Sequence, residues 1–429
     1  MSPVRPMRVG LLGAGTVGRE VARAFADLPE RLAVHGGPRL ELVGVAVRDL
    51  ARARASGIDG RLLTDAPAHL VASPATDVIV ELMGGDEPAR TLIAAALAGG
   101  KGVVTANKHV IAHHGAELEA VVRRSAVALR FEAAVAAGIP VLGPLAAELA
   151  GNRVSRVRGI VNGTTNYILS AMTAEGRAYE EVLAAAKAAG YAEADPSGDV
   201  EGDDAVNKLV ILIRLAFGTW VDPADVVRCP PTADPARSGL PGITGVTAAD
   251  IAGATAVGAS IKLMADARLA PDGRIEASVV PTVVPLDDPM GRTDGVTNRV
   301  EVRGEPVGTV AFEGPGAGGA ATSSAVLGDL LAIARGGGST WAGLPPADAA
   351  PRGTLVGPPD EAPDRGWFAI VRAGVDASAF DAPAATAPAL GGTAVILHGI
   401  SLDQARSQFH AAGLADGGTI LPFDAVARG

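Results

Sequence analysis

Hydrophobic and polar positions follow a repeating pattern along the first 135 residues. Short apolar runs rich in valine and leucine alternate with stretches in which apolar residues recur at helical spacing. The predicted strands are 7–12, 40–47, 77–82, 102–105 and 128–131. Continuous apolar strands are buried on both faces, so their alternation with amphipathic helices predicts a parallel, doubly wound sheet of the α/β class.

The pattern changes after residue 135, where helices and strands no longer alternate one by one. The predicted helices cover residues 167–173, 178–189, 204–217 and 254–267, and the predicted strands cover 154–161, 275–284 and 298–312. This α+β pattern predicts a second domain over residues 136–309.

The last part of the chain is divided by segments rich in glycine and proline. A glycine turn at 314–319 precedes a predicted helix at 325–335, and residues 341–365 have the composition of a linker. Beyond it, residues 366–429 predict a small separate βα unit, with strands at 368–374 and 393–399 and a helix at 402–412.

Length, charge and composition exclude several classes of protein. A chain of 429 residues predicts two or three domains. The net charge of −10 argues against a nucleic-acid binder, which would show a basic surface. There is no uninterrupted run of about 18 apolar residues, and the apolar run near the N-terminus is too short for a signal peptide, so we expect a cytoplasmic protein without a membrane span. Cys229 is the single cysteine and cannot form an internal disulfide.

A glycine motif lies between the first predicted strand and the first predicted helix. It reads Gly13-Ala14-Gly15-Thr16-Val17-Gly18, the G-x-G-x-x-G spacing of dinucleotide-binding turns. The first glycine permits the tight turn, the second lets a pyrophosphate approach the backbone, and the third lets helix and strand pack closely. We therefore expect Gly13, Gly15, Thr16, Val17 and Gly18 to bind a nucleotide at the helix N-terminus.

Two further positions bear on the nucleotide. The second strand ends in Arg48 and then Asp49; the arginine suits a 2′-phosphate and favours NADP, while NAD stays possible. Gly84 and Gly85 follow the strand at 77–82, where ligands of such sheets bind, although an ordinary turn would look the same.

Lysine is scarce, with five in the chain, and two of them lie in motifs. Lys108 closes the segment that begins at Thr105, at the expected carboxyl edge of the sheet. There it could polarise a carbonyl or hold a carboxylate, or it could be a solvated lysine at a helix start. Lys208 follows an acidic segment and precedes five apolar residues, so its helix is expected to be largely buried.

The acidic segment at 190–204 has three interpretations. It could be a solvated loop with an ion pair between Asp204 and Lys208, or a calcium loop, although its spacing does not fit one. In the third interpretation its carboxylates hold a substrate ammonium group while Lys208 handles a proton. The segment 162–166, which includes Thr164, could bind a small polar ligand or simply cap a helix.

Together these motifs resemble the homoserine dehydrogenase family over residues 7–340. The matching segments are GLLGAGTVG at 10–18, VIVELMGG at 78–85, TANK at 105–108, FEAAVAAGIP at 131–140, NGTTNYIL at 162–169, GYAEADPSGDVEGDDAVNKL at 190–209 and GPGAGGAATSSAVLGDL at 314–330. The resemblance implies the NAD(P)-dependent interconversion of L-aspartate 4-semialdehyde and L-homoserine, in the biosynthesis of threonine, methionine and isoleucine.

The resemblance also implies roles for individual residues. Lys208 matches the proton donor/acceptor of the family and Lys108 its second active-site lysine. The residues that match substrate-binding positions are Glu193 and Asp204, with Gly190 and Asp199 beside them. Gly316 would return to the cofactor, so that residues 310–340 complete the nucleotide-binding domain of residues 1–135.

Three further expectations depend on the family alone. A monovalent cation, sodium in most members, would be bound by Glu132, Val135, Ala137 and Ile139, unless Glu132 only tethers a loop. The domain at 136–309 would form a homodimer. Residues 366–429 would be a diverged ACT-like module, because the usual Asp-x-Pro-Gly turn of that module is missing.

Two other functions stay open from the residues. One is a different oxidoreductase acting on an amino-acid semialdehyde or a related oxo acid. The other is a non-catalytic nucleotide-binding regulator with the C-terminal unit as its sensor. The acidic segment argues against a substrate without an amino group, and the presence of both Lys108 and Lys208 argues against a regulator.

Overall fold

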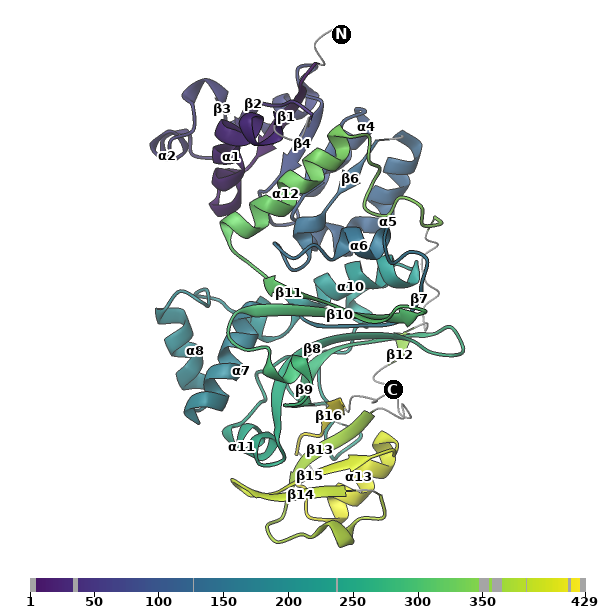
Figure 1. Ribbon diagram of the computed structural model, residues 1–429. Helices are drawn as coiled ribbons and strands as arrows, with labels where there is room; N and C mark the ends of the chain where they lie inside the picture. The colour runs from purple at the N-terminus through teal and green to yellow at the C-terminus, as the bar shows by residue number, and fades with distance from the viewer. Residues whose placement is uncertain are drawn as a thin grey trace. The chain divides into compact units, whose positions relative to one another are not determined.

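The computed structural model describes residues 5–33, 38–125, 127–236, 238–346, 355–356, 365–382, 384–415 and 418–424. The chain divides into two compact units (Figure 1). The first contains residues 1–153, 210–223 and 314–350, and the second contains residues 154–209, 224–313 and 351–429.

The first unit is built on a six-stranded sheet in the order β3-β2-β1-β4-β5-β6, in which neighbouring strands are parallel. The strands are β1 (Met7–Leu12), β2 (Leu40–Ala46), β3 (Leu63–Thr64), β4 (Val78–Glu81), β5 (Gly102–Thr105) and β6 (Leu129–Arg130). The helices between them are α1 (Thr16–Ala33), α2 (Leu50–Ala55), α3 (Pro67–Ala72), α4 (Ala89–Ala98) and α5 (Lys108–Ser125). The prediction of a parallel, doubly wound sheet is confirmed.

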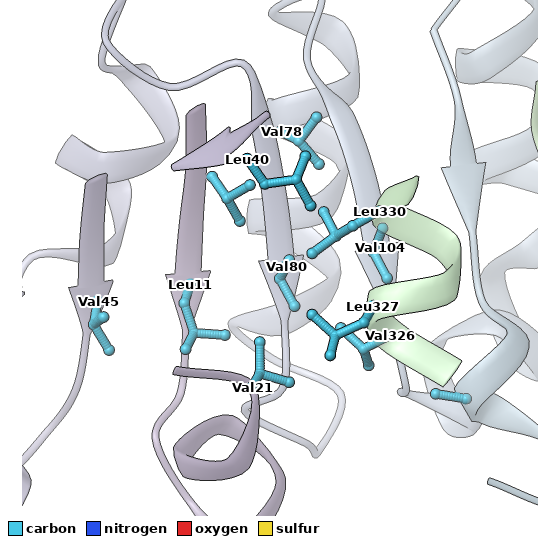
Figure 2. Close-up of a cluster of buried hydrophobic side chains, with 12 residues drawn as sticks. Leu11, Val21, Leu40, Val45, Val78, Val80, Val104, Val326, Leu327 and Leu330 are labelled. Carbon is cyan, nitrogen blue, oxygen red and sulfur yellow. The ribbon is translucent and has the colours of Figure 1, made fainter. Parts of the chain in front are cut away.

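A late segment of the chain completes the core of this sheet. Helix α12 (Gly319–Ala334) contributes Val326 and Leu330, which pack with Leu11, Val80 and Val104 of the central strands (Figure 2). All five of these side chains are fully buried. Helix α12 is therefore part of the core of the first unit, although almost 190 residues separate it from β6.

The second unit contains a ten-stranded mixed sheet, whose main path runs β11-β10-β7-β8-β9-β16-β13-β15-β14. Its strands are β7 (Arg153–Ile160), β8 (Ala259–Leu269), β9 (Ile275–Pro285), β10 (Thr297–Glu305), β11 (Gly308–Pro315), β12 (Leu355–Val356), β13 (Arg365–Val371), β14 (Ala384–Ala389), β15 (Gly392–His398) and β16 (Leu421–Asp424). The helices of this part of the chain are α7 (Gly163–Glu175), α8 (Tyr179–Ala188), α9 (Ser197–Val200), α11 (Ala248–Ala256), α13 (Leu402–Ala411) and the first half of α10 (Asp203–Phe217).

The helix predicted at 254–267 is wrong. The segment contains the end of α11, then Gly258 with a φ of +74°, and then most of β8. The first nine residues of β8 are buried, so the strand shows no alternation of apolar and polar residues. Its alanine, leucine, methionine and lysine residues are good helix formers, and here pairing with β7 and β9 overrides that propensity.

The strands of the C-terminal residues extend the second sheet. Strands β16, β13, β15 and β14 form an antiparallel set in that order, and β16 pairs with β9 in parallel at Phe423 and Val283. Helix α13 packs on this set through Phe409, beside Trp367 and Phe380. The sequence predicted a separate unit for 366–429, whereas these strands share a sheet and a compact unit with residues 154–209 and 224–313.

Most of the predicted linker at 341–365 lies outside the described residues. Within it, β12 pairs in parallel with β9. In the part of the chain that the structure describes, no helix combines the length and the apolar character that crossing a bilayer requires.

Candidate active-site residues in the two units

The carboxyl ends of three central strands meet at one edge of the first sheet. Leu12 at the end of β1 pairs with Glu81 of β4, and Glu81 pairs with Thr105 of β5. The segments that begin at Gly13, Leu82 and Ala106 therefore leave the sheet at the same edge. This is the edge at which open α/β sheets bind their ligands.

The glycine motif has the geometry that its predicted roles require. Gly13 has a φ of +97°, and a Cβ there would lie 2.6 Å from the carbonyl oxygen of Leu82. A Cβ on Gly18 would lie 2.1 Å from the carbonyl oxygen of Gly13, so the helix packs closely on the turn. At Gly15 a Cβ would meet nothing within 4 Å, which leaves the backbone open to a ligand.

The segment that contains Gly316 leads to the beginning of the same helix. Gly316 is buried, and three residues later a Cβ on Gly319 would lie 3.0 Å from the carbonyl oxygen of Thr16. The start of α12 therefore lies beside the start of α1 at Thr16. Both helix N-termini offer backbone N–H groups that have no partner within their own helix.

A buried carboxylate organises the edge of the sheet, and sequence reasoning missed it. The Oε1 atom of Glu81 accepts hydrogen bonds from the N–H groups of Met83 at 2.7 Å and Gly84 at 3.2 Å. Its Oε2 atom accepts a hydrogen bond from the Thr105 hydroxyl at 2.6 Å. Glu81 is fully buried. A charged residue that ends an otherwise apolar strand was the available signal.

The network continues to the helix that begins at Lys108. The Thr105 hydroxyl accepts a hydrogen bond from the N–H of Asn107 at 2.9 Å, and the Asn107 side chain donates to the carbonyl of Gly85 at 2.7 Å. Its Oδ1 atom accepts from the N–H of Val110 at 3.1 Å and so caps α5. The turn at Gly84 and the position of Lys108 are thus fixed by one set of contacts.

Arg48 and Asp49, which follow β2 after Val47, have different surroundings. Asp49 caps α2, because its side chain accepts a hydrogen bond from the N–H of Arg52 at 2.9 Å. Arg48 is exposed. The Asp49 carboxylate is therefore engaged locally, whereas Arg48 is accessible to solvent after β2.

Glu132 makes contacts that bear directly on the predicted cation site. Its carboxylate accepts hydrogen bonds from the N–H groups of Val141, Leu142 and Gly143 at 2.7–2.8 Å. Burial raises the pKa of Glu132, although these hydrogen bonds oppose the rise. The side chain therefore tethers the loop at residues 141–143.

The backbone of the neighbouring turn is strained. Ala136 and Ala137 have positive φ angles of 52° and 44°, which are uncommon for residues other than glycine. Val135 and Ile139 lie on either side and are buried. No group of three acidic, histidine or cysteine side chains suited to a metal occurs among the described residues, so a cation here would depend on backbone carbonyls.

In the second unit, Lys208 is buried and makes two short hydrogen bonds. Its Nζ atom donates to the carbonyl of Val161 at 2.6 Å and to Oδ2 of Asp204 at 2.8 Å. Asp204 lies in the first turn of α10 and Lys208 one turn later, so the i,i+4 spacing read from the sequence forms the ion pair. The exposed fractions of these side chains are 12% and 11%, respectively.

Asn162 joins two carboxylates, Asp199 in α9 and Asp204 in the first turn of α10. Its Nδ2 atom donates to Asp199 Oδ1 at 2.7 Å and to Asp204 Oδ2 at 2.8 Å. Its Oδ1 atom accepts from the N–H of Thr165 at 2.8 Å and caps α7. The sequence left open whether this segment binds a ligand or caps a helix, and it did not single out Asn162.

The remaining predicted substrate residues lie on the acidic loop or contact it. Gly190 has a φ of +78° and terminates α8. Thr164 donates its hydroxyl hydrogen to the carbonyl of Tyr191 at 3.1 Å, which holds the loop on α7. Glu193 is exposed. The structure thus brings Asp199, Asp204 and Lys208 together around Asn162, while Glu193 projects into solvent.

Comparison with known proteins identifies the family. A model of the homoserine dehydrogenase NAD-binding domain matches residues 13–132, and a homoserine dehydrogenase model matches residues 140–331. The chain is 47% identical over 335 residues to homoserine dehydrogenase from Mycobacterium tuberculosis, which covers 77% of this chain and 73% of that protein. It is 44% identical over 358 residues to homoserine dehydrogenase from Corynebacterium glutamicum, covering 81% and 78% of the two chains.

Solved structures agree with the sequence comparison. A homoserine dehydrogenase from Thiobacillus denitrificans aligns with a TM-score of 0.83 and 33% identity, over 98% of this chain and 99% of that one. A hyperthermophilic archaeal homoserine dehydrogenase in complex with NADPH aligns with a TM-score of 0.63 and 28% identity, over 76% and 97% of the two chains. The chain therefore belongs to the homoserine dehydrogenase family and is an oxidoreductase that interconverts L-aspartate 4-semialdehyde and L-homoserine with a nicotinamide cofactor.

Proposed function

We propose that Lys208 donates the proton when the aldehyde of L-aspartate 4-semialdehyde is reduced, and accepts it in the reverse direction. The observation that carries the proposal is the pair of hydrogen bonds from Nζ to Val161 and Asp204. Two of the three N–H groups of the ammonium are thereby used, which leaves one to meet a substrate oxygen. A cation fixed at that point stabilises the alkoxide that develops during the reaction and supplies its proton.

The amino-acid part of the substrate carries an ammonium group that needs negative charge. Asp199 and Asp204 supply it near Lys208, and the exposed carboxylate of Glu193 is available to close on the ammonium. Gly190 and Thr164 place this loop, because the glycine turns the chain out of α8 and the threonine binds the Tyr191 carbonyl. We assign these five residues to substrate binding.

The first unit holds the cofactor, which supplies or accepts the hydride. The turn at Gly13, Gly15 and Gly18 fits a pyrophosphate, because the space at Gly15 is open and the helix N-terminus attracts anions. Thr16, Val17, Gly84, Thr105 and Gly316 complete the proposed contacts. Lys108 begins α5 at the same edge, where its charge can orient a substrate or cofactor oxygen.

We propose NADP as the preferred cofactor, with NAD as the alternative. Asp49 is engaged in capping α2, whereas a carboxylate that reads a ribose 2′-hydroxyl must be available to the ribose. Arg48 is exposed and carries the charge that a 2′-phosphate requires.

A structural monovalent cation is a further proposal. Carbonyl oxygens of Val135, Ala137 and Ile139 are the hard donors that sodium prefers, and the positive φ of Ala137 turns this segment sharply. Glu132 would contribute charge while its carboxylate holds the three N–H groups of the next loop. Binding of sodium would raise thermal stability, as measured in sodium against tetramethylammonium buffers.

We also propose a domain organisation and an assembly for the chain. We assign residues 1–135 with 310–340 to cofactor binding, 136–309 to substrate binding and dimerisation, and 366–429 to an ACT-like module. The elements β13, β14, β15, α13 and β16 follow the order of a β-α-β-β-α-β unit in which a 3-10 turn at Ala377–Ala379 stands where the first helix would be. Light scattering at several concentrations tests the homodimer.

The first experiment is an absorbance assay at the nicotinamide band with L-homoserine and either NADP or NAD. We expect turnover with both and a higher kcat/KM with NADP. A Lys208→Ala variant should retain the fold and lose at least about 100-fold in kcat, the usual contribution of an acid–base group. Wild-type kcat in that variant would refute the proposed role of Lys208.

A further inference from the structure

Asn162 joins Asp204, the carboxylate that binds Lys208, to a second carboxylate, Asp199. It is 5% exposed and lies between β7 and α7, where one residue before it, Val161, supplies the carbonyl that Lys208 binds. Its side-chain amide donates one hydrogen bond to Asp199 and one to Asp204. Two groups therefore orient Lys208. One is the carbonyl of Val161, and the other is the Asp204 carboxylate, which Asn162 binds.

We propose that Asn162 is a positioning residue for the reaction, which fixes the direction of the remaining N–H of Lys208 by holding the carboxylate of Asp204. This inference rests on the proposed proton-transfer role of Lys208.

The amide performs a task that requires two donor hydrogens on one side chain. Asp199 and Asp204 carry like charges, and each receives one hydrogen of the same NH₂ group, so the amide sets the distance between them. Oδ2 of Asp204 then accepts from both Asn162 and Lys208. Without the amide, the two carboxylates would move apart, and the ammonium would follow Asp204.

The Asn162 side chain also caps α7, so the experiment has to distinguish this structural role from the proposed positioning role. Its oxygen accepts the N–H and the hydroxyl of Thr165. Serine and aspartate cap a helix about as well as asparagine but offer no NH₂ group, whereas alanine does neither. The variants Asn162→Ser and Asn162→Asp therefore keep the cap and remove the bridge.

We expect kcat for homoserine oxidation to fall about tenfold in Asn162→Ser, and further in Asn162→Asp, which adds a third carboxylate beside Asp199 and Asp204. KM for NADP should stay the same, and the thermal midpoint of Asn162→Ser should stay within about 2 °C of the wild type. Ser401→Ala is the matched control, because it removes the N-cap of α13 and should reduce stability without a change in kcat.

A double-mutant cycle with Asp204→Asn tests whether Asn162 acts through Asp204. If it does, Asn162→Ser has little further effect on kcat in the Asp204→Asn background. Equal effects in both backgrounds would overturn the inference, as would wild-type kcat in Asn162→Ser. Lys208→Ala, assayed in parallel, separates the two hypotheses. Loss of activity there with full activity in Asn162→Ser refutes only the role of Asn162, whereas full activity in Lys208→Ala refutes both.

Discussion

Arg214 binds both carboxylate oxygens of Glu119 in the interior of the first unit. Its Nε atom donates to Oε2 at 3.1 Å and its Nη2 atom to Oε1 at 2.7 Å. The Arg214 side chain is completely buried, and that of Glu119 is 3% exposed. Trp220 adds a hydrogen bond from its indole N–H at 2.9 Å. The pair joins α5, which begins at Lys108, to the second half of α10.

We expect Glu119→Gln to lower the free energy of unfolding by about 3–5 kcal/mol, because it leaves the buried Arg214 guanidinium without a counter-charge. Glu117→Gln is the control on the same helix. Its ion pair with Arg90 is exposed and should contribute less than about 1 kcal/mol. Urea unfolding of both variants measures the difference. Similar losses in the two variants would show that burial does not determine the contribution of the Glu119 ion pair.

The ion pair of Asp77 with Arg8 predicts a dependence of stability on pH. Hydrogen bonds from Arg8 lower the pKa of Asp77 to about 2. A carboxyl group whose pKa is lower in the folded state stabilises the protein above its unfolded pKa, and that stability is lost as the pH falls through the folded value.

For Asp77 the loss should occur between about pH 4 and pH 2. The side chain is 35% exposed, so solvent screening limits the contribution to about 1 kcal/mol. Urea unfolding of the wild type and of Asp77→Asn at several pH values should give curves that differ at pH 6 and converge near pH 2. A constant difference across this range would exclude the linkage.

The sequence predicted the first unit well because its signals are local. A buried parallel strand is a short apolar run, and the turn after Leu12 needs glycine for steric reasons that hold in any protein. Gly13 and Gly18 could therefore be assigned geometric tasks from spacing alone, and their close approaches to Leu82 and to each other have the expected form. The family and its reaction followed from motifs of the same local kind.

The remaining features depend on contacts between distant segments. Strand β8 was predicted as a helix because pairing with β7 and β9, which its own residues do not reveal, determines its conformation. Glu81 and Asn162 act through partners 24 to 42 residues away, as in the hydrogen bonds to Thr105 and Asp204. The spacing of residues along a chain does not reveal such contacts. A polar residue in an otherwise apolar strand nevertheless marks a side chain that needs a hydrogen-bond partner.

Glu81 is expected to control cofactor affinity although it lies beneath the binding edge. In Glu81→Gln, one carboxylate oxygen becomes an NH₂ group, so either the N–H groups of Met83 and Gly84 or the Thr105 hydroxyl loses its acceptor. The affinity for NADPH should fall about tenfold as the two turns loosen. Fluorescence titration measures this effect, with Glu117→Gln as the control. Unchanged affinity would mean that the turns keep their conformation without the carboxylate.

Arg48 should determine the choice between NADP and NAD. If its guanidinium binds the 2′-phosphate, Arg48→Ser removes a charge-assisted hydrogen bond and raises KM for NADP by about 10- to 100-fold. KM for NAD should hardly change, because NAD has a hydroxyl group at that position. Arg52→Ser, on the exposed surface of α2, should alter neither value. Steady-state kinetics of the two variants with both cofactors would decide the matter, since a parallel rise for NADP and NAD in Arg48→Ser would indicate a general loss of binding rather than recognition of the phosphate.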